Sequence, residues 1–216
     1  MRNVAENGGS MAGEASAKYQ RTALVQHAKI SHNRAMTAGA ALHFASGTKI
    51  FFSDCEFADN VAMIGGVMYI VGDGAVIRFS RSRFASNHLS NSGIHGGATW
   101  HGDGTDTSFS LCTLTSNTAD YGGACAMMKG SKLSFVSTML VDNIAGISGG
   151  GAVWRVRSWL KRFRYSWVMN HEGNESNSRR VGLLIGAVFT EYGRLLTVQS
   201  STFQTNSAPR TGGGAM

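Results

Sequence analysis

The residues that can do chemistry in this sequence are few and widely spaced. Two aspartates, Asp73 and Asp103, stand in matching Gly-Asp-Gly triplets, and Asp106 follows close behind. Carboxylates arranged in this way can bind a cation, but Gly-Asp-Gly is first of all a turn signal. The chain has 13 acidic residues in 216, and no nucleophile motif, phosphate-binding loop or zinc-ligand spacing is present. We therefore expect no catalytic residue, cofactor or metal, with these three aspartates as the candidate cation ligands.

An internal repeat sets the positions of these candidates. A bulky apolar residue stands three places before an asparagine at intervals of about 27 residues. The asparagines of this motif are Asn33, Asn60, Asn87, Asn117, Asn143 and Asn206. A glycine motif repeats with a similar period, at Gly39, Gly66, Gly97, Gly123, Gly151, Gly186 and Gly214. Two independent motifs that share one period predict a solenoid.

The residues between the motifs alternate with the period of a β-strand. Ile50 and Phe52 stand before the bulky Phe57 at every second position, and a small residue, Cys55, stands two places before it. A second alternating run follows each glycine, and the L-x-x-L-x-L pattern of leucine-rich repeats is missing. We predict an all-β fold, a right-handed parallel β-helix (β-solenoid) of about seven coils of about 27 residues.

Composition is consistent with one folded array. Hydrophobic residues make up 43% of the chain and charged residues 15%, which is too apolar for a disordered protein. We expect a partial first coil or a disordered N-terminus at residues 1–24, then a single β-helix array at 25–216. No apolar run is long enough to span a membrane, and residues 1–20 lack the apolar core of a signal peptide. Because repeat units are already running near both ends, we expect a fragment of a longer array.

The two motifs resemble the GGA[ILV] and FxxN repeats of the chlamydial polymorphic membrane proteins and related right-handed parallel β-helix proteins. Full matches to the first motif are Gly97-Ala98, Gly123-Ala124, Gly151-Ala152 and Gly214-Ala215, and full matches to the second begin at Phe57, Phe84 and Phe203. The resemblance implies an extracellular or cell-surface module with an adhesin-like or structural role. Its implied partners are glycans or host and cell-surface proteins, with no specific nucleic acid. The alternative is a polysaccharide-active, pectate-lyase-like β-helix enzyme whose catalytic coils are degenerate or missing here.

A stacked array brings equivalent residues of successive coils together. The asparagines are expected to form a structural ladder of side-chain amides at one corner. Tyr69, Trp100, Trp154 and Phe189 share a register that we assign to the core, the alternative being an outward strip that stacks on glycans. We place His43 and His101 in one register two coils apart, too far to share a metal. Cys55, Cys112 and Cys125 are expected to be free, buried thiols, because the first two lie two coils apart in one register and the third is on another strand.

The stretch from Arg155 to Ile185 departs from the repeat. It carries +5 of the chain's formal net charge of +7, and its only motif, Trp167-x-x-Asn170, is degenerate. We expect an irregular basic insertion at 155–185. One interpretation is a cationic binding patch, formed by Arg155, Arg157, Lys161, Arg162 and Arg164. The alternatives are a decayed coil with a long loop, or foreign sequence from a misread intron.

Overall fold

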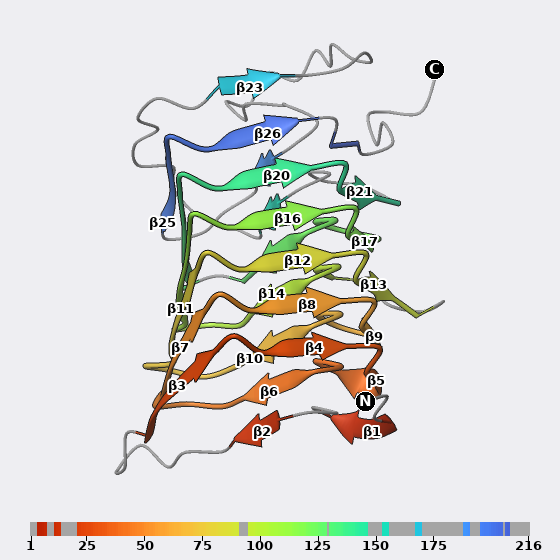
Figure 1. Ribbon diagram of the computed structural model, residues 1–216, viewed down its shortest axis with the longest axis vertical. Coiled ribbons are helices and arrows are strands. Elements are labelled where there is room, and N and C mark those ends of the chain that lie inside the picture. The colour runs from red at the N-terminus through yellow and green to blue at the C-terminus, as the bar shows by residue number, and fades with distance from the viewer. Residues whose placement is uncertain are drawn as a thin grey trace.

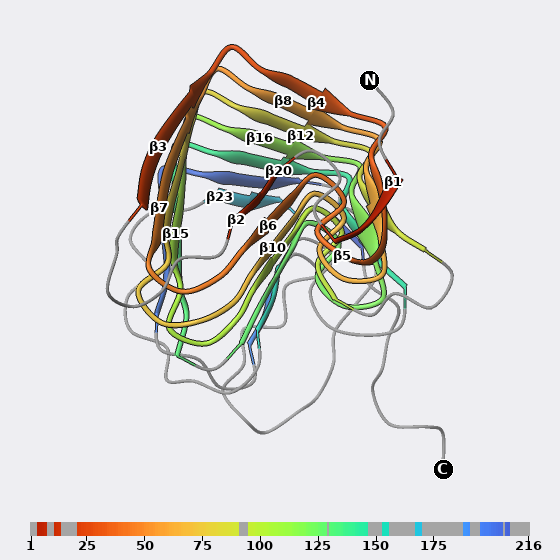
Figure 2. The same cartoon turned by 90° about the horizontal axis from the view of Figure 1, so that it is seen from below.

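The computed structural model is a parallel β-helix (Figure 1). It describes residues 4–7, 11–13, 21–90, 95–128, 130–146, 153–155, 167–169, 188–190, 195–204 and 206–207. These residues include no helix, and therefore none long and apolar enough to cross a membrane. Seen from below, the chain runs clockwise as it recedes from the viewer, so the coils are right-handed (Figure 2). The predicted fold class is confirmed.

Successive coils contribute parallel strands to four sheets, named A to D. Sheet A contains β1 (Val4–Asn7), β5 (Arg34–Ala38), β9 (Val61–Ala62), β13 (His88–Leu89), β17 (Thr118–Ala119) and β21 (Ile144–Ala145). Sheet B contains β2 (Met11–Gly13), β6 (Leu42–Phe44), β10 (Met68–Ile70), β14 (Thr99–His101), β18 (Cys125–Met127), β22 (Val153–Arg155) and β24 (Val188–Thr190). Sheet C contains β3 (Arg21–Gln26), β7 (Thr48–Ser53), β11 (Val76–Ser80), β15 (Asp106–Ser110), β19 (Lys132–Val136) and β25 (Leu195–Gln199). Sheet D contains β4 (Lys29–Ser31), β8 (Glu56–Ala58), β12 (Arg83–Ala85), β16 (Thr113–Thr115), β20 (Met139–Val141), β26 (Thr202–Gln204) and β23 (Trp167–Met169).

The core lies between the sheets and is built from columns of like residues. In sheet C, Ile77 and Phe79 of β11 point inward and are buried, while Arg78 between them is half-buried. Phe79 contacts Phe84 of sheet D edge to face, with ring centroids 4.9 Å apart. Phe84 in turn stacks on Phe57 of the preceding coil at 4.7 Å. The alternation with a period of two therefore arises as predicted, because one face of each strand lies in the core and the other faces outward.

Two sharp corners per coil turn the chain with residues in the left-handed backbone region. The first corner lies just before sheet D, as at Asp54 (φ 57°) and Arg81 (φ 46°), and the second lies just before the asparagines from Asn33 to Asn143, as at Asp59 (φ 53°). After the first corner comes the small residue predicted from the repeat. There the backbone N–H of Cys55 donates to Oγ of Ser82 in the next coil over 3.1 Å. The position is buried and leaves little room, and a short polar side chain such as that of Ser82 can also accept the hydrogen bond that the buried backbone N–H requires.

The asparagines form the predicted ladder at the second corner. Each link is a hydrogen bond of about 3 Å from a side-chain Nδ2 to the Oδ1 of the next asparagine. The links run through Asn33, Asn60, Asn87, Asn117, Asn143 and Asn206. The last link joins residues that are 63 positions apart in the sequence.

The glycine motif makes a tight turn between sheets A and B. Gly65 and Gly96 begin it with positive φ angles of 57° and 69°. At the following position, a Cβ on Gly97 would lie 2.7 Å from the backbone N and O of Thr118 in sheet A. A side chain cannot fit between two backbones this close, which explains why glycine recurs here.

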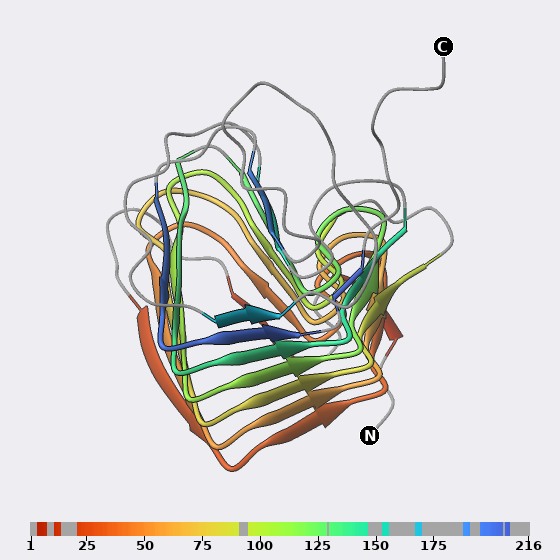
Figure 3. The same cartoon turned by 90° about the horizontal axis from the view of Figure 1, so that it is seen from above.

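The structure corrects the repeat in two places. Leu42 pairs with Met68, so Gly39 corresponds to Gly65. The sequence pattern alone aligns Gly39 with Gly66, which displaces the first repeat unit by one residue. The degenerate motif at Trp167 also does not add a coil between those of β20 and β26, because β20 pairs directly with β26 and β23 lies on the far side of β26. Among the described residues, coils that contribute a strand to each of the four sheets run from β1 to β20, which gives fewer than the seven coils predicted. Seen from above, these coils stack on one another around one axis (Figure 3).

Candidate binding surfaces

The Gly-Asp-Gly triplets are stacked turns between sheets B and C. Asp73 and Asp103 are exposed and lie in neighbouring coils, where Gly74 N donates to Gly104 O over 3.3 Å. Asp106 is held elsewhere, because its carboxylate accepts a hydrogen bond from the Arg78 guanidinium over 2.8 Å. No group of three possible metal ligands occurs among the described residues. The three aspartates do not form one site, and the turn interpretation fits their placement.

Tyr69 and Trp100 of the aromatic register of sheet B point outward, so their assignment to the core was wrong; the side chains of Trp154 and Phe189 lie outside the described residues. Tyr69 and Trp100 are half-buried, while the residues on either side of each are buried. The cause is a bulge at the strand start: Ala98 N and Thr99 N both donate to Ala124 O, at 2.8 and 3.0 Å. Such a bulge shifts the alternation by one, so a buried small residue two places earlier no longer implies a buried aromatic.

This row is nevertheless poorly suited to stacking on a glycan. Tyr69 and Trp100 are parallel within 6° and their centroids are 4.5 Å apart, so the two rings cover each other's faces. His43 precedes them in the same register and lies 5.1 Å from Tyr69. Stacking of a sugar requires an open ring face, and Tyr69 and Trp100 each have one face covered by the other ring. Its contribution is packing between coils.

His101 is not in register with His43 but lies inside the solenoid. It aligns with Ile70 and Met127 on the inner face of sheet B and is fully buried. The ring bridges two hydroxyls, with Nε2 2.8 Å from Thr99 Oγ1 and Nδ1 3.1 Å from Thr107 Oγ1. Burial lowers the pKa of His101 to about 3. The histidine is therefore neutral at ordinary pH.

A directional hydrogen-bond chain passes through this histidine. Thr99 Oγ1 donates to Cys125 Sγ over 3.1 Å, so it accepts from His101 Nε2–H, and Nδ1 accepts from Thr107. Burial raises the pKa of Cys125 to about 12. The Cys-Thr-His arrangement has no access to solvent and a protonated thiol, so it cannot act as a nucleophile. Its role is to satisfy polar groups in the core.

The three cysteines are free and buried, as predicted. Burial raises the pKa of Cys112 to about 11, so this thiol and that of Cys125 behave as small apolar groups. The remaining candidate from the sequence is the basic patch. Arg157, Lys161, Arg162 and Arg164 lie outside the described residues, and only the backbone of Arg155, in β22, is described.

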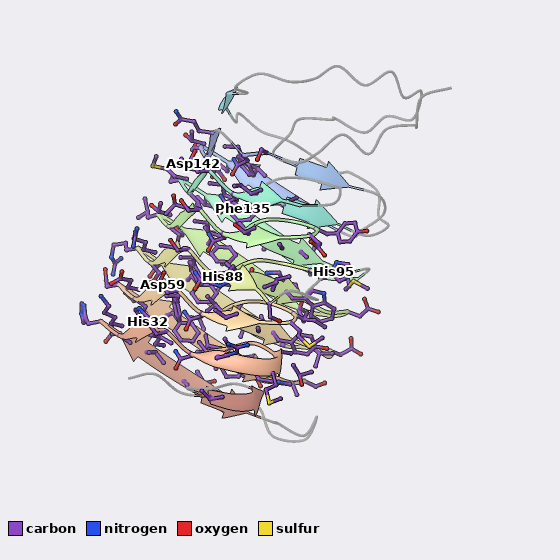
Figure 4. All side chains as sticks on the ribbon, turned by 90° about the vertical axis from the view of Figure 1, so that its right-hand side faces the viewer. His32, Asp59, His88, His95, Phe135 and Asp142 are labelled. Atoms are coloured by element: carbon purple, nitrogen blue, oxygen red, sulfur yellow. The ribbon has the colours of Figure 1, made fainter. Side chains whose placement is uncertain are left out.

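Basic and acidic residue types alternate from coil to coil along sheet D and the two corners that flank it. At three equivalent positions the first coil carries basic residues, the second acidic residues and the third two arginines and a serine. These residues are His27, Lys29 and His32, then Asp54, Glu56 and Asp59, then Arg81, Arg83 and Ser86. Figure 4 shows His32 and Asp59 on one edge of the solenoid, with Asp142 nearer the C-terminal end.

The opposite charges are in contact. Asp54 receives two hydrogen bonds from Arg81, at 2.7 and 2.8 Å. Glu56 lies between Lys29 at 3.3 Å and Arg83 at 3.2 Å. The hydrogen bonds from Arg81, and then that from the Ser53 hydroxyl, hold the pKa of Asp54 well below its usual value.

Sequence reasoning missed this charge ladder, although the signal was present. It shows as soon as the segments HAKISH, DCEFAD and RSRFAS are aligned at the 27-residue offset. His32 and Asp59 complete the first pairing, with 3.7 Å between Nε2 and Oδ2.

One exposed apolar pair interrupts the polar outer face of sheet C. Leu24 and Phe51 are paired in register across β3 and β7, and their side chains are 63% and 40% exposed. Lys49 precedes Phe51 on the same face, and the half-buried Arg78 follows it in the next coil. Large apolar side chains next to cations on a strand face are typical of binding surfaces.

Comparisons of the chain with protein-family models, curated proteins and solved structures found no match.

Proposed function

We propose that this chain is a non-enzymatic β-helix module of an extracellular or cell-surface protein, with an adhesin-like role. The observation that carries the proposal is that three of its described carboxylates, those of Asp54, Glu56 and Asp106, are held in ion pairs. Asp54 and Glu56 are held by cations of neighbouring coils, and Asp106 is held by Arg78. Cleavage of a polysaccharide requires carboxylates that exchange protons or bind a cation. Carboxylates in these ion pairs stabilise contacts between coils instead.

The exposed pair Leu24 and Phe51, with Lys49 and Arg78 beside it, supports a binding role. Leaving this apolar surface in water is unfavourable, and a partner that covers it recovers the hydrophobic free energy. Aromatic and arginine side chains are also common where proteins bind one another. The extracellular or cell-surface location rests on the resemblance of the repeat motifs to surface-displayed β-helix proteins.

The test combines a binding assay with an activity assay. Purified protein is applied to an array of glycans and cell-surface proteins, and incubated with acidic and neutral polysaccharides with and without Ca²⁺. We expect binding that is weakened in Phe51→Ser and retained in Leu111→Ser, which removes an exposed leucine from the corner before sheet D of another coil. Release of reducing or unsaturated sugars by the purified chain would refute the non-enzymatic function.

A further inference from the structure

The outer face of sheet C carries the exposed apolar pair that supports a binding role, and its charges indicate what a partner must offer. Phe51 lies in the middle of β7 and is 40% exposed. Leu24 is aligned with it in the preceding coil, and Arg78 is aligned with it in the next coil. Lys49 stands two residues before Phe51 on the same outward face. The exposed ring of Phe51 therefore has a cation on two of its sides.

The two cations beside Phe51 can each bind a further carboxylate. No described residue forms an ion pair with Lys49. Arg78 is held through one nitrogen, because Nη1 makes its hydrogen bonds to Ile77 O, Asp106 O and Asp106 Oδ1. No described residue accepts a hydrogen bond from its Nε or Nη2. A guanidinium donates from all three of its nitrogens, so these two remain open to an acceptor.

Acidic groups are scarce on this face. Asp106 is the only carboxylate in the described strands of sheet C, and Arg78 already holds it. Asp73 and Asp103 lie in the turns before the face and form no ion pair with its described cations. A partner with negative charge therefore complements the face. A second copy packed through the same face would bring the same excess of cations instead.

Proteins, membranes and acidic glycans can all combine negative charge with apolar surface, and the placement of the apolar pair favours a protein. A residue that enters a membrane must reach into the lipid, whereas Phe51 lies within a strand of a six-stranded sheet. A sugar stacks on a flat ring face, which Leu24 lacks, although it is the more exposed of the pair at 63%. An apolar side chain of a protein can cover both residues.

We propose that the outer face of sheet C around Phe51 binds a partner protein that places an apolar side chain beside a carboxylate. This inference rests on the proposed binding function and adds the chemistry of the partner. The apolar side chain covers Phe51 and Leu24, and the carboxylate binds Lys49 or the open nitrogens of Arg78. Burial of the ring supplies affinity, and the two cations select the partner.

A phage-displayed library of random peptides, selected on the immobilised full chain, tests this chemistry. We expect the enriched peptides to carry an aliphatic or aromatic residue next to an aspartate or glutamate. The most frequent peptide is synthesised with a fluorescent label and titrated into the full chain by fluorescence anisotropy. Its affinity should fall with added salt. A control peptide with asparagine and glutamine at the acidic positions should bind about tenfold more weakly.

Three variants of the chain locate the site. Phe51→Ser removes the exposed ring and Lys49→Glu reverses the charge beside it, so each should weaken binding of the selected peptide by about tenfold. Lys132→Glu makes the same charge reversal at an exposed position of the same face, three coils from Lys49. That distance, about 14 Å, exceeds the screening length at physiological salt, so the affinity should not change. Thermal unfolding verifies that all three variants fold.

Three results would overturn the proposal. Selected peptides that need Phe51 but carry no carboxylate would remove the role of charge. A selection that yields no peptide weakened by Phe51→Ser would exclude a protein segment as the occupant. Binding of vesicles of phosphatidylserine and phosphatidylcholine, or of heparin, that is lost in Phe51→Ser would assign the face to a membrane or a glycan. In that last case the chain would still be a binding module, so the proposed function would stand.

Discussion

Asn60 donates two hydrogen bonds to one atom of Asn87: its backbone N at 3.1 Å and its side-chain Nδ2 at 3.0 Å both reach Oδ1. Asn87 passes the same arrangement on, donating from N and Nδ2 to Asn117. Its Nδ2 also donates to Phe57 O, 3.0 Å away in the preceding coil. One buried amide therefore joins three coils.

Replacing Asn87 with alanine should destabilise the fold by roughly 3 kcal/mol or more, because buried partners in three coils lose their hydrogen bonds. Chemical denaturation measures the change. Thr118→Ala, at an exposed position of β17, is the control and should cost less than about 1 kcal/mol. A loss for Asn87→Ala no larger than the control's would show that the ladder does not stabilise the array.

Phe84→Ala should cost about 3 to 5 kcal/mol, from lost burial and the cavity left behind. The Phe84 ring packs against Phe57, Phe79 and Phe109, with centroid distances of 4.7, 4.9 and 5.5 Å. Phe51→Ala removes a ring that is 40% exposed and should cost much less. Equal costs, measured by urea unfolding, would contradict the assignment of Phe84 to the core.

Stability should fall as the pH drops below about 6.5. The pKa of a solvent-exposed histidine, as in the unfolded chain, is about 6.5, and burial lowers that of His101 in the folded chain to about 3. Between these values the unfolded chain binds a proton that the folded chain does not. Acid therefore favours unfolding, and the contribution is complete above pH 6.5. The loss at pH 5 is about 2 kcal/mol.

His101→Met isolates this contribution, because methionine already occupies the aligned position at Met127. Unfolding free energies of both proteins are compared from pH 7 to pH 5. The pH-dependent difference between them should vanish at pH 7 and grow toward pH 5. Parallel curves would mean that His101 does not titrate on unfolding.

Leu111→Asn should stabilise the protein by about 0.5 to 1 kcal/mol. Leu111 has a φ of 56° and is 58% exposed, a backbone region that is unfavourable for leucine and better tolerated by asparagine. Leu111→Val is the matched test, because a β-branched residue should be worse than leucine there. A melting temperature that rises for valine and not for asparagine would contradict this argument.

The fold was predictable because its strongest signals are periodic. Phe57 and Asn60 recur in the sequence as they recur in space, and parallel stacking converts one period into one column. The position of Tyr69 was not predictable from alternation alone, because the backbone bulge before each short strand of sheet B leaves no signature in residue type. The register of Gly39 was assigned wrongly at the turn before sheet B. Its neighbour Ala40 occupies the position at which the coils of β10, β14 and β18 have a second glycine.

The candidate surfaces were harder to predict than the fold. Asp73 and Asp103 were placed correctly in equivalent turns, but Asp106 is bound to Arg78, a residue of the preceding coil. Predicting the charge ladder requires the exact register between coils, because Lys29 and Glu56 form an ion pair only where the register makes them neighbours. Pairing across coils is a tertiary property, and the residue types at single positions do not reveal it.

The link from Asn143 to Asn206 has an entropic consequence. A normal link closes a chain segment of about 27 residues, whereas this one closes 63. The entropy lost when two positions of an unfolded chain are brought together grows only with the logarithm of the number of residues between them, so closing 63 residues costs about 0.8 kcal/mol more than closing 27. A single corner hydrogen bond offsets a penalty of that size. At this point the array can therefore accommodate added sequence of considerable length, which makes it a favourable position for inserting a foreign peptide.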